Sequence, residues 1–192
     1  MRLANIRTFY PRKHLTQLGD RQFIYPYLLR NLKVKGKNQV WAIDITYVPM
    51  QKGFMYLTTI IDVHSRDLVD SGLSNTLEAA ASLQVLKEAI AEHGKPEILN
   101  NDQGSQFTCK KYGAYLKSEK ISISMDGKGR ALDNIYIERF WRTIKYQHIY
   151  LNPADDGITL YQGISRWIEK YNHKPHQGIS RNKPAQLFKV AA

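Results

Sequence analysis

From Val40 onward, short stretches of β-branched and aromatic residues alternate with longer stretches whose apolar residues recur at helical spacing. Three strands are predicted first, at 40–48, 54–63 and 67–74, joined by turns at 49–53 and 64–66. A helix is predicted over 76–94, because Gly94 is a good C-cap, and a short buried strand follows at 96–101. This order favours a sheet flanked by helices.

The second half of the chain continues the alternation. After a loop at 102–106, a helix is predicted over 107–120, a fifth strand over 121–125 and a glycine-containing loop over 126–130. A long helix follows at 131–150, a last helix at 159–173, and then a tail as far as 188. Hairpin-linked strands followed by strand–helix crossovers predict an α/β fold with a mixed five-stranded sheet, in which the first and fourth strands are neighbours.

Residues 1–38 differ from the rest in charge, with nine Arg and Lys residues against one acid, Asp20. Pro11, Pro26, Gly19 and Gly36 interrupt any long helix there. We interpret 1–38 as a basic N-terminal arm or linker, with a merely solvated tail as the alternative. Residues 39–190 are predicted to form the core domain with a C-terminal helix and tail.

The whole chain is strongly basic, with a formal net charge of +11 and a pI of about 9.7. Such an excess indicates either a polyanionic partner, above all DNA or RNA, or a charge that serves solubility alone. The single cysteine, Cys109, excludes an intrachain disulfide and a Cys-rich zinc site. With no apolar run of about 18 residues and no apolar signal core, we expect a cytoplasmic protein without membrane contact.

Three carboxylates stand in apolar surroundings. Asp44 lies in the middle of the first strand, Asp102 directly follows the fourth strand, and Glu138 lies in the long helix. Each of them alone is more typical of a paired structural acid or a solvated surface residue. Because strands one and four are predicted neighbours and the helix can cross that edge, we expect the three to converge.

Carboxylates that converge repel one another, and divalent cations relieve the repulsion. Mg²⁺ prefers hard oxygen ligands, and two such ions about 3.5–4 Å apart can hold the attacking and leaving oxygens of a phosphoryl displacement. An acidic pocket on a basic protein therefore predicts metal-dependent chemistry on a nucleic-acid backbone. Mg²⁺ or Mn²⁺ is the expected cofactor, with two ions in the site.

Five blocks of the sequence, in this order, resemble the integrase-like catalytic core of bacterial insertion-sequence transposases: WAIDITYVP, DVHSRDLV, NNDQGSQFT, SMDGKGRALDNIYIERFWRTIKY and YNHKPHQGI. The spacing agrees as well, with 35 residues between Asp102 and Glu138 and a basic residue, Lys145, seven positions after Glu138. Among these transposases, the most similar group is the one in which the second reading frame of the insertion sequence encodes the catalytic subunit. Two small departures are the NND block, where Ser or Thr is frequent in the middle place, and Lys174, where Arg is usual.

The resemblance implies a ribonuclease H-like fold and a polynucleotidyl transferase that cleaves DNA and transfers strands during transposition. It assigns catalysis and metal binding to Asp44, Asp102 and Glu138. For DNA contacts we expect Lys145, which shares a helix face with Glu138, together with Arg142, Lys128, Arg130, Gln103 and Asn134. Trp141 and Phe140 are expected in the core, and His173 and His176 are not expected to bind metal.

The expected partner is DNA, both the element ends and the target, bound by a multimer of this chain. Relatives usually carry helix-turn-helix segments before the core. We therefore expect either a truncated copy or a separate helix-turn-helix protein that recognises the ends. Two alternatives stay open: a ribonuclease H-fold nuclease without strand transfer, and an inactive remnant that only binds DNA.

Overall fold

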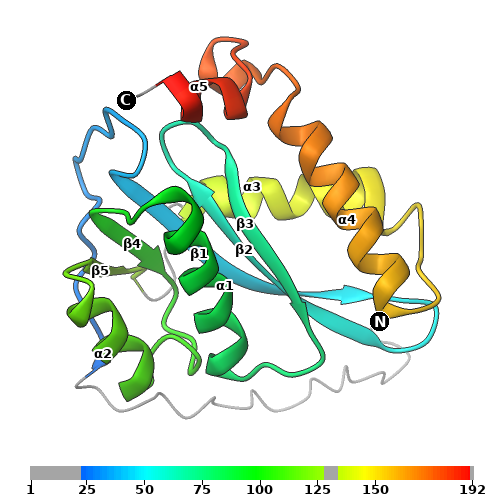
Figure 1. The fold of residues 1–192 in the computed structure, drawn as a ribbon, viewed down its shortest axis with the longest axis horizontal. Helices are drawn as coiled ribbons and strands as arrows, with labels where there is room; N and C mark the ends of the chain where they lie inside the picture. The colour runs from blue at the N-terminus through cyan, green and yellow to red at the C-terminus, as the bar shows by residue number, and fades with distance from the viewer. Residues whose placement is uncertain (1–22, 128–133, 191–192) are drawn as a thin grey trace, which may run out of the picture.

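The structure is a computed structural model that describes residues 23–127 and 134–190. Its centre is a five-stranded sheet in the order β3-β2-β1-β4-β5 (Figure 1). The strands are β1 (Val40–Pro49), β2 (Phe54–Asp62), β3 (Leu68–Ser74), β4 (Ile98–Asn101) and β5 (Ser122–Met125). The first three strands pair antiparallel, whereas β4 runs parallel to both β1 and β5, so the predicted mixed sheet is confirmed.

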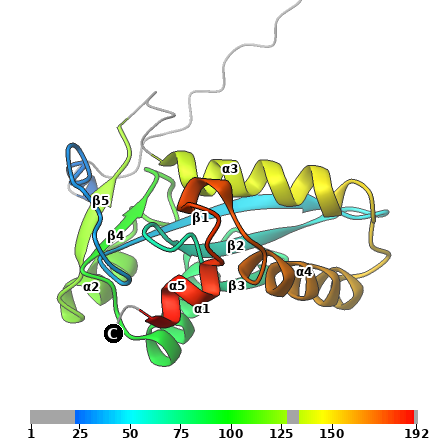
Figure 2. The ribbon, with the colours of Figure 1, turned by 90° about the horizontal axis from the view of Figure 1, so that it is seen from above.

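Two layers of helices cover the sheet (Figure 2). On one face lie α1 (Ala79–His93) and α2 (Lys110–Ser118), and on the other lies α3 (Ile135–Ile144), which continues into the π-helix η4 (Lys145–Ile149). The helix α4 (Gly157–Asn172) contacts the edge strand β3, and the chain ends through a 3-10 turn η5 (Gln177–Ile179) and α5 (Pro184–Val190). No helix in the described part of the chain is long and apolar enough to cross a membrane.

The alternation of side chains along β1 divides the core into two clusters. Trp41 and Ile43 point to the α1 and α2 face, whereas Val40 and Ala42 point to the α3 face. Both pairs are almost fully buried, because β1 is the central strand of the sheet. Asp44 and Thr46 belong by the same alternation to the α3 face, and this places the first predicted site residue under α3.

Two predicted elements differ from the structure. The helix expected over 131–150 begins at Ile135 in the described residues and changes into a π-helix at Lys145. Ile144 and Ile149 are both buried, and a spacing of five residues fits one side of a π-helix better than one side of an α-helix. The tail, expected without structure, forms α5, in which Phe188 packs on the α1 side against His93.

Part of the segment predicted as an arm lies against the core. Leu29, Leu32 and Val34 contact the α3-side cluster. The backbone N–H of Leu28 donates to Ser124 Oγ at 3.0 Å, beside β5. The boundary at residue 38 stays a prediction, and residues 1–22 lie outside the described part.

Candidate active site

Two of the three predicted carboxylates lie on neighbouring parallel strands, Asp44 within β1 and Asp102 just after β4. In the β1–β4 ladder Ala42 is paired with Asn100. Asp44 and Asp102 each lie two residues further along, and Asp102 directly follows the end of β4. The sheet thereby brings together two acids that are 58 positions apart in the sequence.

The helix α3 lies over β1 at this point. Trp141 donates its indole N–H to Asp44 Oδ2 at 2.8 Å, and Lys145 donates from Nζ to Thr46 Oγ1 at 2.6 Å. Glu138 precedes Trp141 by three residues and Lys145 follows it by four, so all three lie along one side of the helix. Glu138 and Lys145 therefore flank the Trp141 contact with Asp44, as their spacing of seven predicts.

The surroundings of the Asp44 carboxyl group disfavour its ionised form. Burial, the largest cause, raises its pKa to about 6, and the charges of Asp102 and Glu138 act in the same direction. The Trp141 indole and the backbone N–H of Ile45, at 2.8 Å from Oδ1, act in the opposite direction because they stabilise the ionised form. The coupling shows that Asp102 and Glu138 are both within electrostatic reach of Asp44.

Asp102 has a similar environment. Burial raises its pKa, and the backbone N–H of Gly104, which donates to Oδ1 at 2.9 Å, opposes this increase. Burial also lowers the pKa of Lys145, while the charge of Asp44 raises it. The site therefore holds two half-buried acids and one cation, which all lack the solvation that would favour their charged forms.

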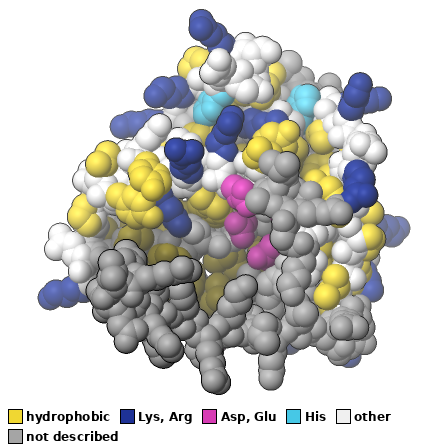
Figure 3. Space-filling model, turned by 180° about the vertical axis from the view of Figure 1, so that it is seen from behind, with side chains coloured by type: hydrophobic (Ala, Val, Ile, Leu, Met, Phe, Trp, Pro, Cys, Tyr) yellow, Lys and Arg dark blue, Asp and Glu magenta, His cyan; other side chains and the backbone are white. Residues whose placement is uncertain are grey.

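The three acids are near one another without forming a closed cage. Among the described residues, no group of three His, Cys, Asp or Glu side chains has the geometry to hold a metal ion. The side chain of Glu138 is exposed, whereas Asp44 and Asp102 are half-buried. On the face seen in Figure 3, acidic side chains gather in one small group, and Lys and Arg side chains lie around it.

The donor set nevertheless fits a divalent cation. It consists only of carboxylate oxygens, which hard cations such as Mg²⁺ prefer. The burial and mutual repulsion that raise the pKa of Asp44 are the conditions that a bound cation would relieve.

The predicted DNA contacts are distributed unevenly. Arg142 is exposed in the last turn of α3. Gln103 lies beside Asp102 and donates to the backbone oxygen of Asp126 at 2.9 Å. Asn134 is buried at the N-cap of α3 without a side-chain cap hydrogen bond. Lys128 and Arg130 lie outside the described residues.

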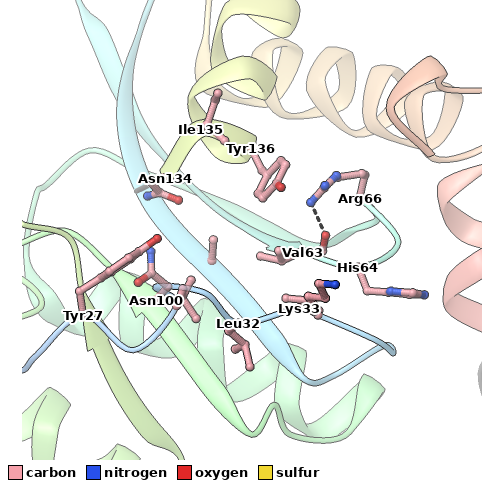
Figure 4. A pocket seen from close by; sticks show the side chains of 13 residues that line it. Tyr27, Leu32, Lys33, Val63, His64, Arg66, Asn100, Asn134, Ile135 and Tyr136 are labelled. Atoms are coloured by element: carbon pink, nitrogen blue, oxygen red, sulfur yellow. Dashed lines mark hydrogen bonds between the residues drawn. The ribbon is translucent and has the colours of Figure 1, made fainter. Parts of the chain in front are cut away.

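A cavity of about 550 Å³ lies beside the start of α3 (Figure 4). Ala42 and Asn100, the paired residues just before Asp44 and Asp102, form part of its lining. Asn134 and Tyr136 enter it from the start of α3, and the Arg66 guanidinium lies over the Tyr136 ring, 3.2 Å from its centroid. The start of α3 is thus bordered by a space with polar side chains on its walls.

Trp141 has a second role that the sequence interpretation did not assign. Its predicted burial is confirmed, as is that of Phe140, but the indole N–H also holds Asp44. The signal was present, because a buried indole usually finds a hydrogen-bond acceptor and Trp141 shares a helix side with Glu138. His173 and His176 contact backbone oxygens of α4, those of Glu169 and Tyr171 respectively.

The chain is similar to known proteins in sequence and in fold. Two family models, both described as integrase core domain, match residues 35–131 and 119–184. A transposase for the insertion sequence element IS904 from Lactococcus lactis is 31% identical, over 94% of this chain and 73% of the relative. The chain spans only 53% and 56% of two other insertion-sequence proteins, from Escherichia coli and Shigella sonnei.

Solved structures show the same fold at low sequence identity. The HTLV-2 integrase catalytic core domain in complex with magnesium matches 81% of this chain and 99% of its own, with a TM-score of 0.66 and 19% identity. A simian T-cell lymphotropic virus intasome chain matches 82% of this chain and 56% of its own, with a TM-score of 0.72 and 19% identity. The predicted ribonuclease H-like fold is confirmed. The chain belongs to the integrase core domain family, among the insertion-sequence transposases.

Proposed function

We propose that this chain is the catalytic core of a transposase that cleaves DNA strands and transfers them to new sites, using Asp44, Asp102 and Glu138. The observation that carries the proposal is the parallel register of β1 and β4, which puts Asp44 and Asp102 at matching positions, with Glu138 on α3 within electrostatic reach of Asp44. The 31% sequence identity with the Lactococcus lactis transposase supports this reaction.

The proposed role of each carboxylate follows from its position. Asp44 and Asp102 would hold the divalent cations, and the exposed Glu138 would complete the ligand set by turning toward them from α3. Mg²⁺ or Mn²⁺, proposed as two ions, would supply an activated attacking oxygen and neutralise charge on the phosphate. The HTLV-2 core domain, whose structure was solved in complex with magnesium, supports this choice.

The remaining groups position the carboxylates and the DNA. Trp141 orients Asp44 through its indole, and the Gly104 N–H holds one oxygen of Asp102. Lys145, on the same side of the helix as Glu138, is placed to contact a phosphate near the acids once it releases Thr46. We propose a multimer of this chain on DNA, which the intasome assembly of the viral relative supports. A separate protein for end recognition also stays a proposal.

Metal-dependent cleavage tests the proposal directly. Purified protein is incubated with labelled DNA that carries the ends of its element, with Mg²⁺ or with EDTA, and nicked and joined products are separated. We expect both products with Mg²⁺ only, and a loss of at least about 1,000-fold in rate for Asp102→Asn, on the scale of losing an essential catalytic group. Asp155→Asn, at an exposed position, is the matched control.

The outcomes separate the candidates. Nicked products without joined products would replace the proposal with a nuclease of the same fold. An Asp102→Asn protein that is folded, binds DNA and cleaves it as fast as the parent would remove the assignment of the site. DNA binding without any metal-dependent product would leave an inactive DNA-binding remnant.

A further inference from the structure

The last of the five sequence blocks, YNHKPHQGI at residues 171–179, plays no part in the site described above. It ends α4 and folds back beside α3. There it lines a groove together with Arg139 and Thr143 of α3 and Gln147 of η4, which are spaced four apart in the sequence. We call this the α3–α4 groove; its lining is Arg139, Thr143, Gln147, Trp167, Lys170, Tyr171, Lys174, Pro175, His176 and Gln177.

The groove is an extended space rather than an isolated pit. Its main part has a volume of about 380 Å³, and a second part of about 230 Å³ shares Arg139, Tyr171, His176 and Gln177 with it. The second part reaches Arg66 and Tyr136, which also line the cavity beside the start of α3, together with Ala42 and Asn100. A polymer bound in the groove would therefore extend toward the candidate active site.

Cations line the groove without carboxylate partners. Arg139, Lys170 and Lys174 are exposed, and the one ion pair recorded within the described residues, His93 with Glu92, lies elsewhere. Glu169 is adjacent to Lys170 in the sequence but is not part of the lining. The uncompensated positive charge fits a polyanion.

One wall of the groove is aromatic. Trp167 and Tyr171 stack at 5.4 Å between ring centroids with planes 26° apart, and the buried Phe140 contacts both from α3. Rigid rings bordered by cations are the surface that a sugar–phosphate backbone with its bases finds favourable. A shallow charged patch of flexible side chains would lack this fixed wall.

Folding accounts for only some residues of the block. Asn172 accepts from the Leu68 N–H at 2.9 Å and donates to the Leu68 oxygen at 3.0 Å, which fastens α4 to β3. His176 contacts the Tyr171 oxygen and ring. The side chains of Lys170 and Lys174 take part in no such contact within the described residues, so packing does not explain them.

We infer that the α3–α4 groove binds the sugar–phosphate backbone of one DNA strand beside α3. Arg139, Lys170 and Lys174 hold phosphates, and the Trp167–Tyr171 wall contacts sugar or base. Glu138 and Arg139 are consecutive on α3 and therefore point about 100° apart around its axis, so α3 borders both the groove and the catalytic carboxylates. This inference rests on the proposed function, because it extends the DNA path of the same site.

Binding without cleavage tests the inference. The affinity of the full chain for a labelled random-sequence duplex and for a labelled oligothymidine is measured in EDTA by fluorescence anisotropy, between about 50 and 200 mM salt. We expect Lys170→Ala with Lys174→Ala to lower the affinity roughly tenfold and to reduce the slope of log affinity against log salt by about 2, one for each lost phosphate contact. Trp167→Leu is expected to weaken oligothymidine more than duplex, since unpaired bases stack on rings.

The matched control is Lys110→Ala with Lys111→Ala, which removes the same charge from exposed positions of α2 on the other face of the sheet. Equal affinity and equal salt slope for the groove variant and the parent would overturn the inference, as would an equal loss for the α2 control. A groove variant that changes only self-association, seen by sedimentation without DNA, would also overturn it, because the groove would then hold a second copy. A parent that binds DNA in this way and never cleaves it would sink the proposed function alone.

Discussion

Trp141 contributes both to the packing of the core and to the candidate site. The ring is in the core, 8% exposed, while the indole N–H reaches Asp44. The hydrogen bond favours the ionised carboxylate and counteracts the burial that raises its pKa to about 6. One side chain thus stabilises α3 on the sheet and keeps Asp44 suited to a cation.

Trp141→Phe separates these two roles, because the aromatic bulk stays and the donor is lost. Without the donor, the pKa of Asp44 in the metal-free protein should rise further above its ordinary value, and the acid should ionise only at higher pH. A carboxyl-carbon NMR titration measures this shift. We also expect metal-dependent cleavage to fall about tenfold, on the scale of one hydrogen bond to a charged group, with the loss largest at low pH.

Phe140→Leu is the control, since it alters the same core cluster without touching Asp44. An unchanged titration of Asp44 in Trp141→Phe would show that the indole does not govern this carboxyl group. An equal rate loss in both variants would assign the effect to packing alone.

Among the elements, the strands were the most predictable from sequence. Runs such as 40–48 and 54–63 carry β-branched and aromatic residues bounded by turns, and the observed strands agree within a few residues. Convergence of Asp44 and Asp102 followed from strand order alone. Local pattern does not determine side-chain details such as the Trp141 contact, the exposure of Glu138 or the absence of a closed metal group in the described residues.

The helix termini and the tail were less predictable, because tertiary contacts determine them. The π-helix η4, which begins at Lys145, buries Ile149. The helix α5 depends on the contact of Phe188 with the α1 side. Pro184 was interpreted as part of an irregular tail, although proline is well tolerated in the first turn of a helix. The YNHKPHQGI block resembled its family in sequence without revealing that Asn172 fastens α4 to β3.

Asn172→Ala should therefore loosen α4 as an element. The substitution leaves the Leu68 N–H and oxygen without their partner, and an unsatisfied buried group costs about 1–3 kcal/mol. We expect the free energy of unfolding in urea to fall by about 2 kcal/mol. Asn75→Ala, at an exposed position between β3 and α1, should change it by less than about 0.5 kcal/mol. Equal stability of the Asn172 variant and the parent would show that α4 is held by apolar contacts alone.

At the scale of the whole molecule, a net charge of +11 surrounds a site of converging acids. A positive surface attracts a polyanion such as DNA over long range, and in the proposed function Asp44, Asp102 and Glu138 would repel the phosphate nearest to them. The two effects act at different distances, so general attraction and local repulsion coexist until cations neutralise the acids. DNA binding should consequently depend on divalent cations in a manner that the total charge does not predict.

Asp102→Asn tests this balance, because it removes one negative charge from the site and leaves the basic surface intact. In EDTA the variant should bind duplex DNA about fivefold more tightly than the parent, since two unit charges about 4 Å apart in water interact by about 1 kcal/mol. With Ca²⁺ replacing Mg²⁺ to limit cleavage, the parent should gain affinity and the difference should shrink or reverse. Asp155→Asn makes the same change in net charge outside the site, and we expect it to strengthen binding only slightly and equally in both conditions. Equal gains for the two variants in EDTA would mean that total charge alone governs binding, and that Asp102 does not lie close to the bound phosphate.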